Sequence, residues 1–202
     1  MLKQKLLLRN LINFTMLCKI NHNKFIKNII IKDNNLPSLY LNDNNIFDIK
    51  NKKDYSVEHI YPKKFLDKKH HLDMHNLIRT NNIINNLRSN YKFTDKDDIL
   101  FDKNWVKLSY GNYLNHHDRL FIPNDISKGF ISRTIMYLAW QYGYNPYKII
   151  SHNNLINWCL NNPPDYKERY HNEVVNSIQF KNNIFISNYN NKDYYNQLKK
   201  LF

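Results

Sequence analysis

One stretch of the sequence, residues 56–93, constrains the fold of this chain more than any other. Residues 56–60 read as a β-strand that ends near Pro62, because proline donates no backbone hydrogen bond and restricts the residue before it. A basic loop follows, then a returning strand over residues 72–78 and a helical segment over residues 81–87. This order predicts an α+β fold in which a small hairpin and its helix are braced by other helices.

The same stretch contains side chains suited to metal and proton chemistry. Glu58 and His59 are neighbours, so they can serve one site only at a strand end or a bulge. Carboxylate and amide oxygens are hard ligands for Mg²⁺, and a neutral imidazole can accept a proton from water near pH 7. Composition does not select the amide among the nearby asparagines, which are Asn81, Asn82, Asn85, Asn86 and Asn90.

Two other groups in this stretch have competing interpretations. Three histidines resemble a zinc cluster, but their uneven spacing and the lack of nearby cysteine disfavour zinc; they are His70, His71 and His75. The loop lysines are either a solvated surface or, beside a metal site, a track for phosphates. These lysines are Lys63, Lys64, Lys68 and Lys69.

Helical patterns dominate the second half of the chain. Residues 128–142 carry apolar side chains at helical spacing and end at Gly143. Residues 151–160 predict a second helix. A third begins at Asp165, where Glu168 three residues later indicates a capping box. These helices would brace the hairpin.

The net charge of +13 and a pI near 9.6 indicate an acidic partner. Nucleic acid is the leading candidate and an anionic membrane the second. Only three glycines and no P-loop are present, which argues against a nucleotide-driven enzyme.

The first 32 residues carry lysine and arginine but no acidic residue, and they predict a basic amphipathic helix, with an organelle presequence as the alternative. No run of 18 apolar residues occurs, so no transmembrane helix is expected. There is no clear signal peptide, and the only cysteines are Cys18 and Cys159. An intracellular, viral or organellar location is therefore expected rather than secretion.

Beyond these patterns, the chain resembles the bacterial endonuclease I family, whose members carry a ββα-metal (His-Me finger) core. The resemblance covers roughly residues 56–188, and its most specific part is the Arg-Ser-Asn block with its upstream asparagine. Downstream segments also match, including Pro123 to Asp125, Lys128-Gly129 and the helix that follows Trp158. The motifs are Glu58-His59, Asp73-Met74-His75-Asn76-Leu77, and Asn85 followed by Arg88-Ser89-Asn90-Tyr91-Lys92-Phe93.

The resemblance implies a role for each matching residue. Glu58 and Asn85 would hold one Mg²⁺ or Mn²⁺, and His59 would be the general base. The implied activity is hydrolysis of phosphodiester bonds in DNA, with RNA as a second candidate, at little sequence preference and with a 5′-phosphate on the product. Arg88 and Arg133 lie in matching segments and would contact phosphates together with the loop lysines, or else form buried ion pairs.

Two features depart from the family pattern. Family members carry a longer insert between Glu-His and Asp-Leu-His, often with a phosphate-contacting arginine, whereas the residues between His59 and Asp73 include no arginine. Lysines could substitute there, although they lack the bidentate fork of arginine. In addition, Asn86, Phe180 and Ile184 stand where the family has glycine or proline.

The domain organisation expected from these observations has three parts. Residues 1–50 form a basic extension, residues 51–188 the nuclease domain and residues 189–202 a tail, and the protein is expected to be a monomer. The alternative function is a non-catalytic nucleic-acid-binding protein that kept the nuclease fold. A sequence-reading homing endonuclease is disfavoured because no module for reading bases is evident in the helical half.

Overall fold

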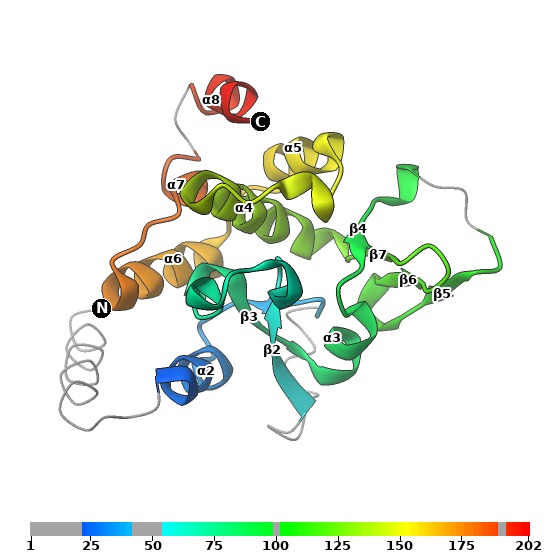
Figure 1. Cartoon of the computed structure of the whole chain (residues 1–202), viewed down its shortest axis with the longest axis horizontal. Coiled ribbons are helices and arrows are strands. Elements are labelled where there is room, and N and C mark those ends of the chain that lie inside the picture. Colours follow the sequence, from blue (N-terminus) through cyan, green and yellow to red (C-terminus); the bar gives the residue numbers. More distant parts are fainter. Residues whose placement is uncertain (1–21, 42–53, 99–101, 190–192) are drawn as a thin grey trace.

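Helices and two small sheets make up the computed structural model, which describes residues 22–41, 54–98, 102–189 and 193–202 (Figure 1). This arrangement confirms the predicted α+β class. Short 3₁₀ turns connect several elements; they are Lys63–Phe65, Lys68–His70, Met74–Asn76, Lys96–Asp98, Ser109–Gly111 and Pro146–Lys148. Within the described residues, no helix has both the length and the apolar character needed to cross a membrane.

The first sheet has three strands in the order β1-β3-β2, of which β1 is Ser38–Leu39. Strand β2 (Tyr55–His59) pairs antiparallel with β3 (Leu77–Asn81), which places Glu58 opposite Ile78. Helix α3 (Asn82–Arg88) follows β3 directly, and the Asn81 side chain accepts the first free backbone N–H groups of this helix. The predicted strand–loop–strand–helix order is therefore confirmed.

The returning strand begins later than the sequence suggested. It was expected over residues 72–78, but β3 is Leu77–Asn81, and Met74–Asn76 form a 3₁₀ turn. The physical reason is local, because the Asp73 side chain accepts the backbone N–H of His75 and holds the chain in a turn. Residues 74–76 therefore form a buried turn that leads into the strand rather than a part of the strand itself.

Residues 22–41, which the sequence assigned to a basic extension, lie in the same fold. Helix α2 (His22–Lys32) buries Ile26 and Ile30 in a cluster that includes residues of β3 and of α6 (Tyr166–Gln179). Strand β1 (Ser38–Leu39) pairs parallel with β3. In the described part of the chain, the fold thus includes elements on both sides of residue 50. Residues 1–21 of the predicted extension lie outside the described residues.

A second sheet, which was not predicted from the sequence, has the strand order β4-β7-β6-β5. Strands β6 (Tyr113–Asn115) and β7 (Leu120–Ile122) form an antiparallel hairpin, and β4 (Lys92–Phe93) pairs parallel with β7. Strand β5 (Trp105–Lys107) completes the sheet. Figure 1 shows this sheet beyond α3, with the chain leading from α3 into β4.

Helix α4 (Asp125–Tyr142) is the central helix, and most of its side chains are buried. As predicted, it ends at Gly143, which adopts the left-handed conformation at φ 73°. Around it lie α5 (His152–Asn161), α6 (Tyr166–Gln179), α7 (Ile184–Ser187) and α8 (Tyr194–Leu201) (Figure 1). The Asp165 side chain accepts the backbone N–H of Glu168, which confirms the predicted cap of α6.

The segment expected as a C-terminal tail also contributes to the core. Tyr194 and Leu198 of α8 are buried, and the Tyr194 hydroxyl donates to the carbonyl of Phe185. Helix α8 therefore covers the same core as α5 and α7.

Candidate active site

Glu58 stands near the end of β2 and is almost fully buried. Its Oε1 accepts hydrogen bonds from Arg88 Nη1 at 2.7 Å and from the Tyr40 hydroxyl at 3.2 Å. Burial raises the pKa of Glu58 to about 7, against the opposing effect of the Arg88 guanidinium. The carboxylate is thus fixed in place but desolvated, a setting in which a second cation would favour its charged form.

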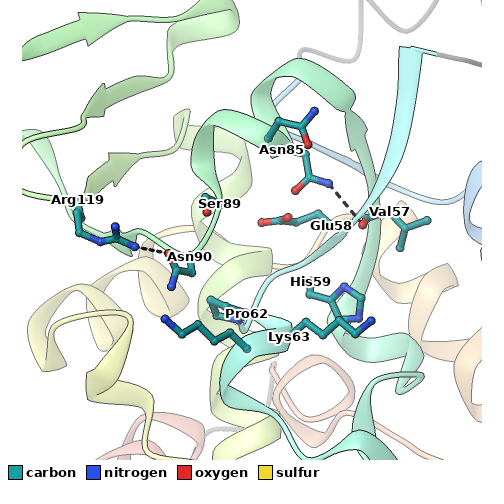
Figure 2. A pocket seen from close by; sticks show the side chains of 11 residues that line it. Val57, Glu58, His59, Pro62, Lys63, Asn85, Ser89, Asn90 and Arg119 are labelled. Atoms are coloured by element: carbon teal, nitrogen blue, oxygen red, sulfur yellow. Dashed lines mark hydrogen bonds between the residues drawn. The ribbon is translucent and has the colours of Figure 1, made fainter.

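Asn85 projects from α3 toward the same strand. Its Nδ2 donates to Ser56 Oγ at 2.8 Å and to the carbonyl of Val57 at 3.5 Å. Because a carbonyl oxygen can only accept, these bonds determine the amide orientation. Figure 2 shows the other end of the amide, Oδ1, directed toward the Glu58 carboxylate. Two ligand-type oxygens therefore face one another.

His59 is the last residue of β2. Glu58 and His59 thus lie at a strand end, where two neighbouring residues can serve one site. Its Nε2 lies 3.0 Å from the carbonyl oxygen of His71. The carbonyl can only accept, so Nε2 carries the proton and Nδ1 is left as the acceptor of the neutral ring. Burial lowers the pKa of His59 to about 4, which keeps the ring neutral at pH 7.

These three side chains line one open cavity of about 500 Å³. In Figure 2, Arg119 and Asn90 lie on one side of Glu58, while Val57 and His59 lie on the other. The full lining is Val57, Glu58, His59, Pro62, Lys63, Lys64, Asn85, Asn86, Ser89, Asn90 and Arg119. The structure thus brings together Glu58, His59 and Asn85.

The basic loop is only partly at this cavity. Lys63 and Lys64 line it, whereas Lys68 and Lys69 are exposed on the next turn and do not. A further cation comes from α2, because the charge of Lys27 contributes to the low pKa of His59. The cavity lining itself contains Lys63 and Lys64, and Lys27 acts on His59 from outside that lining.

Arg88 is not placed where it could contact a phosphate. It is fully buried, and its guanidinium donates to Glu58 and to the carbonyl oxygens of His59, Ile60 and Ser89. It acts instead as the support of the Glu58 carboxylate. The family motif that suggested a phosphate contact thus corresponds to a structural cation beneath the site.

Arg133 is likewise removed from the surface. It pairs with the buried Glu168 through two contacts of 2.6 Å and donates to the carbonyls of Cys159 and Asn162. Both arginines that were candidate phosphate contacts are therefore in buried ion pairs, the second of the two interpretations open from the sequence.

The oxygens at this cavity fit a hard divalent ion better than zinc. Within the described residues, no cluster of three or more His, Cys, Asp or Glu side chains is placed to hold a metal. His70, His71 and His75 each bond to a separate partner: Tyr144 Oη, the carbonyl of Leu66 and the carbonyl of Lys181. Mg²⁺, in contrast, is usually held by one or two side-chain oxygens together with water and substrate phosphates.

Three residues at this site were missed by the reasoning from sequence. Tyr40 and Lys27 come from the segment assigned to an extension, and nothing in their local sequence indicates that Tyr40 bonds to Glu58 or that the charge of Lys27 lowers the pKa of His59. Arg119 follows the polar turn Asn115 to Asp118, which is a recognisable hairpin signal. That signal predicts the turn, but it does not predict which cavity the hairpin reaches.

A neutral imidazole, a carboxylate and an amide oxygen line this cavity together with lysines. Such a set of groups can catalyse the hydrolysis of phosphate esters with the help of a divalent ion. In a comparison with family models, the Endonuclease I model matches residues 8–190. The chain belongs to the endonuclease I family, and it is an endonuclease. The match begins well before the resemblance seen in the sequence and includes α2 and β1. No curated protein matches the chain.

Proposed function

We propose that this protein is a metal-dependent endonuclease that hydrolyses phosphodiester bonds of DNA with little sequence preference. RNA is the second substrate to be tested. One observation carries the proposal: Glu58, His59 and Asn85 line a single cavity, although β2 and α3 are separated by the whole basic loop and β3. In this proposal, β2, β3 and α3 form the ββα-metal finger of the family.

Glu58 and Asn85 would hold one Mg²⁺ or Mn²⁺ between them. The ion would neutralise charge on the phosphate and on the leaving 3′ oxygen. Arg88 and Tyr40 keep the carboxylate in place from behind. Because the Val57 carbonyl holds the Asn85 amide nitrogen, the amide oxygen stays on the cavity side.

His59 would act as the general base. The His71 carbonyl holds the proton on Nε2, so Nδ1 is free to take a proton from the attacking water. Attack in line with the 3′ oxygen would leave a 5′-phosphate on the product. The low pKa of His59 keeps nearly all of the protein in the basic form at pH 7.

Substrate recognition would rest on the phosphate backbone. Lys63 and Lys64 line the cavity, and Lys68 and Lys69 continue the basic loop. Phosphate contacts position the chain of the nucleic acid and carry no base information, so a broad cleavage pattern is expected. A monomer would suffice, because one chain supplies all of the proposed residues.

The competing function, a non-catalytic nucleic-acid-binding protein, needs the charge but not the Glu58–His59–Asn85 arrangement. Plasmid nicking in Mg²⁺ and in EDTA separates the two. We expect nicking in Mg²⁺, none in EDTA, and a decrease in kcat of about 10²–10⁴-fold for His59→Ala, the range for loss of a general base. The affinity of His59→Ala for DNA, measured in EDTA, should be nearly the same as that of the unmodified protein.

The matched control is His152→Ala, which removes an exposed histidine outside the cavity. It should nick DNA at the rate of the unmodified protein. Nicking that persists in EDTA would contradict the metal requirement. If His59→Ala nicks DNA at the rate of the unmodified protein, the general base is another residue. Tight binding of DNA without any cleavage would favour the non-catalytic protein.

A further inference from the structure

Among the described residues, Arg119 is the only arginine in the lining of the candidate catalytic cavity. It comes from the β6–β7 hairpin of the second sheet, whereas Glu58, His59 and Asn85 belong to the first sheet and α3. Figure 2 shows its side chain at the edge of the cavity, beside Asn90. The second sheet therefore contributes a cation to a site that is otherwise built from the β2–β3–α3 unit.

The side chain is held in a defined position. Its Nη2 donates to Asn90 Oδ1, and its guanidinium lies 4.8 Å from the centre of the Tyr91 ring. The Tyr91 hydroxyl in turn contacts His116 Nδ1 at 3.0 Å, which ties the hairpin to the end of α3. Asn90 and Tyr91 thus hold an exposed arginine that would otherwise sample many rotamers.

The backbone at Arg119 is also unusual. Its φ of 57° lies in the left-handed region, which is unfavourable for a residue with a Cβ. Strained residues of this kind cluster at functional sites because the surrounding structure enforces a particular direction of the side chain. Here the strained position is the last residue of the hairpin turn and directly precedes β7, and its side chain lines the cavity.

No carboxylate pairs with this guanidinium among the described residues. The carboxylate of the nearest acid in sequence, Asp118, accepts a hydrogen bond from Asn115 Nδ2 and pairs with His117, while the Asp118 backbone N–H donates to Asn115 Oδ1. An exposed, oriented arginine with several free N–H groups matches the geometry of a phosphate. Lys63 and Lys64 lie in the same lining, so cations are present on more than one side of Glu58.

We propose that Arg119 binds a phosphate of the cleaved strand next to the scissile one, and so sets the register of the strand over Glu58 and His59. The inference rests on the proposed function, since it assumes that the cavity accepts a phosphodiester chain. It assigns the second sheet a part in substrate binding through the β6–β7 hairpin.

The first test measures binding to a short DNA duplex in EDTA at several salt concentrations, for Arg119→Ala and Arg119→Lys. Loss of one phosphate contact should reduce the slope of log K against log salt by about 0.9 in Arg119→Ala. Arg119→Lys should restore the slope, because lysine keeps the charge, but it should restore only part of the affinity, because it lacks the fork. Thermal unfolding of both variants checks that they are folded.

The matched control is Lys107→Ala, which removes one exposed positive charge from β5 of the same sheet, outside the cavity. A general loss of charge predicts equal effects for Lys107→Ala and Arg119→Ala. A specific contact predicts a change of slope for Arg119→Ala alone.

The second test locates the phosphate with duplexes that carry a single neutral methylphosphonate at successive positions. For the unmodified protein, one neutral linkage beside the cleaved bond should weaken binding. The same linkage should cause no further loss in Arg119→Ala, because the two changes remove one interaction. Additive losses at every position would overturn the inference. Binding that no methylphosphonate affects would instead contradict the proposed function itself.

Discussion

Tyr40 links the candidate metal-binding carboxylate to the second half of the fold. Its hydroxyl donates to Glu58, its ring packs edge-on against Phe121 of β7, and its backbone bonds to Ser127 and Asn112. Its φ of 64° is left-handed, so the surrounding contacts hold it in a conformation that tyrosine rarely adopts. A single residue thus joins β1, β2 and the start of α4.

We predict that Tyr40→Phe weakens the response of cleavage to Mg²⁺. The change removes the hydroxyl that positions Glu58 Oε1 and leaves the ring in place. Loss of such a supporting group typically reduces metal affinity or activity by about 10–100-fold. A titration of nicking activity with Mg²⁺ should therefore show half-saturation at a higher concentration.

The control for this prediction is Tyr61→Phe. It removes a buried tyrosine's hydrogen bond to the carbonyl of Asn145, which lies away from Glu58. Both variants should lose about 1 kcal/mol of stability, the usual contribution of one hydrogen bond. Only Tyr40→Phe should change the Mg²⁺ dependence, and equal behaviour of the two would contradict a link between Tyr40 and the metal.

The residues of the candidate site differ in how far the sequence could predict them. Glu58, His59 and Asn85 belong to short motifs near one another, and the strand end after His59 follows from Pro62. Arg88 and Arg133 show the limit of this reasoning. A motif identifies an important arginine, but burial decides whether it meets a phosphate or a carboxylate. Tyr40 and Arg119 depend on contacts between distant elements, for which no local pattern exists.

At the scale of elements, α4 shows why one glycine is required inside a buried helix. Gly129 faces the end of α5, and a Cβ at this position would lie 2.4 Å from the carbonyl oxygen of Asn162 and 2.7 Å from Arg133 Nη2. That carbonyl is also an acceptor for Arg133. The close approach of α4 to this loop therefore supports the buried ion pair with Glu168.

We predict that Gly129→Ala destabilises the protein, although alanine is the better helix former by about 1 kcal/mol. The clash forces the backbone of Asn162 away and disturbs the acceptors of Arg133, and overpacking of this kind costs about 1–3 kcal/mol. Chemical denaturation should show a lower midpoint. Gly143→Asn is the control, because asparagine tolerates the left-handed cap and a Cβ there would meet no atom within 4 Å. Equal midpoints for Gly129→Ala and the unmodified protein would contradict the clash.

Long, capped elements could be predicted and short ones could not. α4 and α6 carry apolar periodicity over several turns together with terminal signals at Gly143 and Asp165. The strands of the second sheet are only two or three residues long, too short for alternation to be recognised.

At the scale of the whole molecule, buried histidines tie stability to pH. His75 and His171 are almost fully buried between the turn at Met74, α4 and α6, and each bonds through Nε2 to a backbone carbonyl. Burial lowers the pKa of His75 to about 4 and that of His171 to about 3. The unfolded chain, with an ordinary histidine pKa near 6.5, binds more protons than the folded protein between these values.

We therefore predict that the free energy of unfolding decreases as the pH falls from about 6.5 toward 4. The contribution of each depressed histidine is fully present above its unfolded pKa and is lost at up to about 1.4 kcal/mol per pH unit below it. Burial raises the pKa of Glu58 to about 7, which offsets part of the loss because the folded state then binds the extra proton.

Urea unfolding at several pH values measures this dependence. His171→Gln keeps a donor for the Met74 carbonyl and cannot titrate. Between pH 6 and 4, unfolding of the variant should therefore take up about one proton fewer than unfolding of the unmodified protein, and its free energy of unfolding should decrease less steeply. An identical slope in the variant and the unmodified protein would exclude His171 as a source of the acid sensitivity.

The net charge of +13 belongs to the whole chain, but only some of its lysines lie near the cavity. We predict that DNA binding weakens steeply with salt, with log K falling by about 0.9 per phosphate contacted for each unit of log salt. Replacement of Lys63, Lys64, Lys68 and Lys69 by glutamine should reduce that slope.

The control replaces four exposed lysines outside the basic loop and the cavity lining by glutamine, and so changes the net charge equally. These lysines are Lys103, Lys107, Lys148 and Lys200. If both quadruple variants lose the same slope, binding follows overall charge and the loop is not a phosphate track. A marked base preference in the cleavage pattern would also contradict recognition by phosphate contacts alone.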